Sequence, residues 1–123
     1  MRFTWPALLA CLALTACGGP KFPPETDAAK GRELLKNVLD SWKNGGRPED
    51  LKEATPSVVA SDPDWKAGCR LVGYEIAPED RRAGVDLLVS VKLQLTRPDG
   101  KPQEKKVNFA VGFGSSTVVL RHE

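Results

Sequence analysis

The sequence predicts a single α+β domain. One long N-terminal helix and a short second helix pack on a curved antiparallel sheet of three to four strands. Residues 34–42 carry an apolar stripe with helical spacing, and residues 85–96 alternate apolar with polar side chains as a half-buried strand does. Two more strand-like segments, residues 103–112 and 117–121, follow after turn residues. A sheet with one apolar face must be covered, and the helical stripe is the candidate large enough to cover it.

Length and composition also indicate one globular domain. The chain has 123 residues, of which 41% are hydrophobic and 28% are charged, which is ordinary for a folded protein. The formal net charge is only +2. Proteins that bind nucleic acid normally have a clustered basic surface, so we expect no nucleic-acid partner.

The N-terminus has the features of an export signal. Arg2 supplies a positive start, and residues 3–14 form a mainly apolar run. A membrane-spanning helix needs about 20 apolar residues, so this run is too short to remain as a span. We therefore expect residues 1–16 to be a cleaved signal peptide.

The segment Leu14-Thr15-Ala16-Cys17 resembles the lipobox of bacterial lipoproteins. The resemblance implies that the Cys17 thiol is diacylglycerylated and that the chain is cut just before it. The acyl chains would then bind the membrane, each buried CH₂ contributing about 0.8 kcal/mol. The alternative is cleavage elsewhere by an ordinary signal peptidase, which leaves Cys17 as a free thiol. Gly18 replaces the Asp typical of inner-membrane retention, so in a cell with two membranes we expect an outer-membrane protein of the cell envelope that faces the periplasm.

The mature chain divides into a lipidated tether, residues 17–26, and a single domain, residues 27–123. The tether is rich in Gly and Pro, which disfavour helix and sheet interiors. Thr26 or Asp27 can cap a helix that continues to about Asn44, and Pro48 suits the start of a second helix to about Ala54.

The remaining elements follow from β-type patterns and turn residues. The predicted strands are residues 69–76, 85–96, 103–112 and 117–121, and residues 58–60 are a candidate for a further short strand. One helical turn is expected at 62–65 and a polar loop at 78–84. A helix followed by a sheet that wraps it resembles the cystatin-like and nuclear transport factor 2-like folds, and small uncharacterised lipoproteins of that cone shape. The resemblance implies a fold but transfers no activity.

Few residues are candidates for chemistry. His122 is the only histidine and stands next to the C-terminal residue, so neither a catalytic triad nor a multi-histidine metal site is expected. Asp62 and Asp64 flank Pro63, and they are either paired carboxylates for acid–base work or the cap of a helical turn. We expect no catalytic residues, no metal and no cofactor.

Four further side chains have two interpretations. Trp65, Tyr74, Cys69 and Phe109 either fill the core or line a ligand pocket between helix and sheet. Cys69 is the only cysteine left besides Cys17 after signal cleavage, so it is either a buried core residue or a reactive thiol.

The leading expectation is a non-enzymatic, lipid-anchored module that binds another envelope protein or forms a homodimer. The alternative is a small-molecule pocket of the cone-shaped class, with or without enzyme activity.

Overall fold

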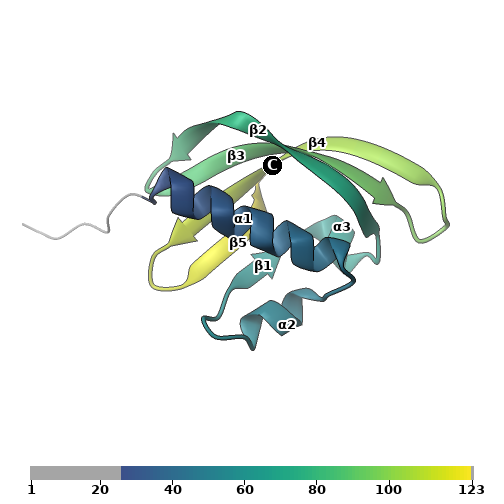
Figure 1. The fold of residues 1–123 in the computed structure, drawn as a ribbon, viewed down its shortest axis with the longest axis horizontal. Helices are drawn as coiled ribbons and strands as arrows, with labels where there is room; N and C mark the ends of the chain where they lie inside the picture. The colour runs from purple at the N-terminus through teal and green to yellow at the C-terminus, as the bar shows by residue number, and fades with distance from the viewer. Residues whose placement is uncertain (1–25, 123) are drawn as a thin grey trace, which may run out of the picture.

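The computed structural model describes residues 26–122. The predicted signal peptide, Cys17 and all of the predicted tether except Thr26 therefore lie outside the described residues. The described chain is an α+β domain, which confirms the predicted class (Figure 1). In chain order its elements are α1 (Ala28–Lys43), α2 (Pro48–Lys52), β1 (Val59–Ser61), α3 (Pro63–Lys66), β2 (Arg70–Ala83), β3 (Asp86–Thr96), β4 (Pro102–Phe113) and β5 (Thr117–His122).

The sheet is mixed and has five strands, so the prediction of three to four antiparallel strands is wrong. The strand order is β1-β5-β4-β3-β2. Strands β2 to β5 form an antiparallel meander, whereas β1 lies parallel to β5, with Val59 opposite Val118. A three-residue strand carries too short a pattern to indicate its partner or its direction.

The predicted polar loop at 78–84 is also wrong, because β2 continues to Ala83. Pairing with β3 is interrupted after Ile76 and resumes at Asp80. The continuation is an edge strand with exposed charged side chains, and such a strand has no apolar alternation to reveal it. The chain turns instead at Gly84, whose φ of 67° suits glycine.

Helix α1 lies along the face that the curved sheet presents to it (Figure 1). The Asp27 carboxylate caps it by accepting a hydrogen bond from the Lys30 N–H at 3.0 Å. Gly31 permits a close approach to the sheet, since a Cβ there would lie 2.9 Å from a methyl carbon of Leu87. The helix buries the predicted stripe through Leu35, Val38, Leu39 and Trp42.

Strand β3 forms the centre of the core, which confirms its predicted alternation. Its side chains that face α1 are at most 2% exposed, and they pack with Phe109 and Val111 of β4 and Val119 of β5. These β3 residues are Leu87, Val89, Val91, Leu93 and Leu95. No helix within residues 26–122 has the length and apolarity needed to cross a membrane.

Candidate functional site

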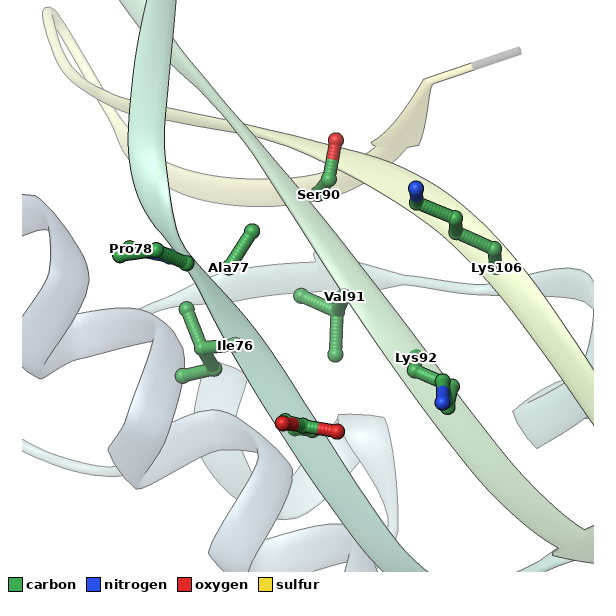
Figure 2. Close-up of a pocket in the computed structure, with 8 residues that line it drawn as sticks. Ile76, Ala77, Pro78, Ser90, Val91, Lys92 and Lys106 are labelled. Carbon is green, nitrogen blue, oxygen red and sulfur yellow. The ribbon is translucent and has the colours of Figure 1, made fainter.

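A pocket of about 210 Å³ opens where β2 separates from β3 (Figure 2). Its apolar lining comes from Ile76 and Val91 together with Ala77 and Pro78. Its polar lining is Glu75, Ser90, Lys92 and Lys106. We call this site the bulge pocket.

The pocket exists because the two strands lose register. Ile76 pairs with Val91 and Asp80 pairs with Val89, so residues 77–79 of β2 bulge out opposite the single residue Ser90. Pro78 lies in the bulge, where its missing N–H breaks no ladder hydrogen bond.

Helix α1 fixes the bulge from the other side of the sheet. The Arg32 guanidinium donates a hydrogen bond to the Ala77 carbonyl and lies 3.5 Å from the Asp80 carboxylate. The pocket is therefore held open by a side chain that contacts both the bulge and the strand that follows it.

The rim of the pocket carries a net positive charge, because its two lysines outnumber the single glutamate, Glu75. Lys92 and Lys106 lie opposite each other on β3 and β4, and alternation with buried Val91 places them on the face away from α1. Lys92 is 3.9 Å from Glu104, whereas Lys106 has no ion pair within the described residues. Lys92 is also opposite Glu75 on β2, so its charge is partly balanced within the sheet, and Lys106 is the less balanced of the two lysines.

Ser90 is engaged by its neighbours. Its hydroxyl donates to the Asn108 side-chain oxygen at 2.7 Å, and Arg81 donates to the same oxygen at 3.3 Å. The Ser90 hydroxyl proton is therefore directed at an amide oxygen, which is not a base. The arrangement suits binding of an apolar group that carries a negative charge.

Trp65 and Cys69 line a surface groove of about 280 Å³, together with Trp42 and residues 43–47. The Trp65 ring stacks on Trp42 with centroids 5.2 Å apart, and its indole N–H donates to the Gly46 carbonyl at 3.0 Å. Cys69 is buried, and its carbonyl accepts the Trp42 indole N–H at 2.9 Å. Burial raises the pKa of the Cys69 thiol, and the nearby Asp64 charge adds to the effect, so the thiolate is disfavoured.

Phe109 is 2% exposed and fills the space between α1 and the sheet. With Trp65 it borders a void of only about 10 Å³, which is about the smallest space that holds one water. Among the described residues, the interior between helix and sheet is thus filled by side chains rather than by a ligand-sized cavity.

Tyr74 lies apart from the other three candidates, at the contact between β2 and α1. Its hydroxyl donates to the Asp40 carboxylate at 2.6 Å. Burial and this hydrogen bond raise the pKa of Tyr74 to about 12, so the side chain stays neutral as a structural donor. The four candidates are therefore distributed over the core and the helix–sheet contact.

Asp62 and Asp64 belong to a buried ion cluster with Arg121. Asp62 caps α3 by accepting from the N–H groups of Asp64 and Trp65 at 2.7 and 3.1 Å. Arg121 donates to Asp62 at 2.6 Å and to Asp64 at 2.7 Å, and Lys105 donates to Asp64 at 2.9 Å. The side chains of Arg121 and Asp62 are only 6% and 2% exposed. These bonds hold both carboxylates in structural roles.

The cluster makes the fold sensitive to acid. Burial alone raises the pKa of Asp64, but hydrogen bonds from Arg121 and Lys105 outweigh it and leave the pKa below the ordinary 3.8. A lowered pKa in the fold stabilises the protein above pH 3.8, and that stabilisation is lost as the pH falls through the folded-state value.

We therefore expect the free energy of unfolding of Asp64→Asn to fall less between neutral and acidic pH than that of the wild type. Urea unfolding at about pH 5 and about pH 2.5 measures the loss between the two conditions, and the variant should lose less than the wild type. Asp99→Asn, in the turn after β3, is the matched control and should lose as much as the wild type. An equal loss in Asp64→Asn and the wild type would contradict the assigned role of Asp64.

Sequence reasoning missed the bulge pocket and the partners of the two aspartates. One signal was present, because Arg121 alternates with Val119 and so occupies an apolar face where a charge needs a partner. Within residues 26–122, no group of three metal-ligating side chains comes together. Comparison with protein-family models, curated proteins and solved structures finds no match to this chain.

Proposed function

We propose that this protein is a lipid-anchored cell-envelope protein whose domain is a non-enzymatic protein-interaction module. Acyl chains on Cys17 hold it at the membrane, which is the periplasmic side of the outer membrane in a cell with two membranes. We also infer a cone-shaped fold of the cystatin-like class, supported by a helix that lies under a curved sheet (Figure 1). The lipobox sequence supports the anchor, and the bulge pocket supports the interaction.

The partner that fits the bulge pocket is an acidic segment of another envelope protein. Two ammonium groups on neighbouring strands favour a carboxylate, and the partly exposed apolar lining of Ile76, Ala77 and Pro78 favours an apolar side chain beside it. A segment with an aspartate or glutamate next to a large apolar residue supplies both groups. Charge complementarity is thus the observation that carries the proposal.

The size of the pocket favours a protein over a small molecule. Pockets that enclose drug-sized ligands measure about 300–1,000 Å³, whereas this one has about 210 Å³ and is open to solvent. It matches a single side chain inserted from a larger surface. A small-molecule site between the helix and the sheet finds less support, since the void there has about 10 Å³.

Both edge strands of the sheet are protected against pairing with another strand, which favours a partner that binds to the face of the sheet. Strand β1 is only three residues long, and β2 carries a proline, bulges and a run of charged residues at 79–82. These features are the ones that protect edges from pairing with another strand. A partner therefore gains more by contacting the face around the bulge pocket than by extending the sheet.

Site-specific photo-cross-linking in the native envelope tests this proposal. A photoreactive phenylalanine at Glu75, an exposed lining position, should give one cross-linked product, and the additional double substitution Lys92→Glu/Lys106→Glu should abolish it. Lys43→Glu/Lys52→Glu makes the same charge change on the exposed surfaces of α1 and α2 and should leave the product unchanged. Persistence of the product in the pocket variant would contradict the proposed site. A product of twice the protein's mass would identify the partner as a second copy rather than another protein.

A further inference from the structure

The position of Thr26 shows at which end of the sheet the tether from Cys17 joins the domain. Thr26, the first described residue, is tied to the sheet by a hydrogen bond from its N–H to the Val85 carbonyl at 2.9 Å. Val85 lies in the β2–β3 turn, and the β4–β5 turn lies at the same end of the sheet (Figure 1). The β3–β4 turn lies at the opposite end.

Chain length limits which end can touch a membrane. Nine residue steps separate Cys17 from Thr26, and a fully extended chain covers at most about 32 Å over that length. Ten residue steps separate the ends of β3 and span about 34 Å, and the β3–β4 turn lies beyond Thr96. A molecule standing on its β3–β4 turn would hold Thr26 farther from the bilayer than its tether can reach.

Exposed apolar side chains occur at the tethered end. Phe113 is 42% exposed at the end of β4, and Val59 is 37% exposed on β1. The two lie on opposite faces of the sheet, since Val59 shares a face with its partners Val118 and Gly112, whereas Phe113 is the next residue after Gly112. Aromatic side chains are enriched at membrane–water interfaces, where an apolar ring meets the headgroups.

We infer that the tethered end, defined by the β2–β3 and β4–β5 turns, rests on the bilayer surface with Phe113 at headgroup level. This inference rests on the proposed acyl anchor at Cys17. A short tether keeps the local concentration of membrane high, so one aromatic contact is enough to bias the orientation. The bulge pocket lies about halfway along β2 and β3. It is then held above the headgroups, where a partner protein can reach it.

Tryptophan quenching in brominated phosphatidylcholine vesicles tests the orientation. Phe113→Trp and Val72→Trp are made in the full-length, acylated protein, and wild-type emission from Trp42 and Trp65 gives the background. Val72 is the matched control, because it is exposed and apolar but lies near the opposite end of the sheet, where the neighbouring Leu71 pairs with Leu95. Excess quenching should be at least about twofold greater for Phe113→Trp than for Val72→Trp.

Flotation of the same vesicles separates the hypothesis of the acyl anchor from that of the orientation. Co-flotation with equal quenching of both tryptophans, or with stronger quenching at Val72, overturns the orientation and leaves the anchor intact. Failure of the acylation-competent protein to float overturns the anchor, and the orientation with it.

Discussion

Replacing Arg121 with methionine should destabilise the domain by about 3–5 kcal/mol, the range seen when one partner of a buried ion pair is removed. Methionine preserves much of the length of the side chain but supplies no donor. Asp62, whose side chain is 2% exposed, then keeps its charge with only the α3 backbone to satisfy it. Small domains are typically stable by about 5–15 kcal/mol, so the loss is a large fraction of the total.

Urea unfolding followed by circular dichroism measures this loss as a lower midpoint with an unchanged slope. The triple variant Arg121→Met/Asp62→Asn/Asp64→Asn is the control, because it also removes the stranded charges, while the asparagine that replaces Asp62 can still cap α3. It should regain part of the stability. A loss below about 1 kcal/mol in the single variant would show that the pair with Asp62 is not a buried one.

Replacing Trp42 with alanine should have an effect of similar size, about 3–5 kcal/mol, as expected for a large aromatic side chain in a core. Trp42 is 3% exposed, stacks on Trp65 and donates its indole N–H to the Cys69 carbonyl. Truncation leaves a cavity and removes both interactions at once. It also separates the end of α1 from the segment that precedes β2.

The variant Trp42→Phe separates packing from hydrogen bonding. It keeps an aromatic ring against Trp65 but loses the donor to Cys69 and part of the buried ring volume, so its loss of stability should be clearly smaller than that of Trp42→Ala. Thermal unfolding of both variants gives the comparison. Equal losses would mean that the hydrogen bond to Cys69, rather than the stacked ring, holds this part of the core together.

The parts of the fold that could be predicted are those with long periodic patterns. Strand β3 places five apolar side chains on one face, and α1 repeats its apolar residues over several turns, so each pattern has one interpretation. The α+β class followed from those two elements. The pairing of β1 with β5 did not, because three residues carry no periodicity and the pairing depends on the path of the whole chain.

The candidate site was hidden for a related reason. The bulge pocket depends on a change of register between Ile76 and Asp80, and register is a property of two strands rather than of one sequence segment. Residues 78–84 contain proline, glycine and charges, which also describe a loop. Ser90, Lys92 and Lys106 are the polar half of ordinary alternating strands, so nothing in their spacing marked them as a site.

The four aromatic and thiol candidates were marked as a possible site, although they lie in the core or against it. Trp65, Cys69 and Phe109 were singled out by residue type, and the structure places all three in the core. Tyr74 packs against that core, with its hydroxyl on Asp40. Residue type alone does not separate a core aromatic from a pocket aromatic, because both need the same apolar surroundings.

The anchor at Cys17 is the central claim, and the intact mass of the protein extracted from the native membrane tests it most directly. We predict a chain that begins at Cys17 and carries the added mass of a diacylglyceryl group, with or without a third acyl chain on the new amino group. The Cys17→Ala variant should lose this mass and leave the membrane fraction. A mature chain with an unmodified Cys17 thiol, or one cut at another position, would contradict the account.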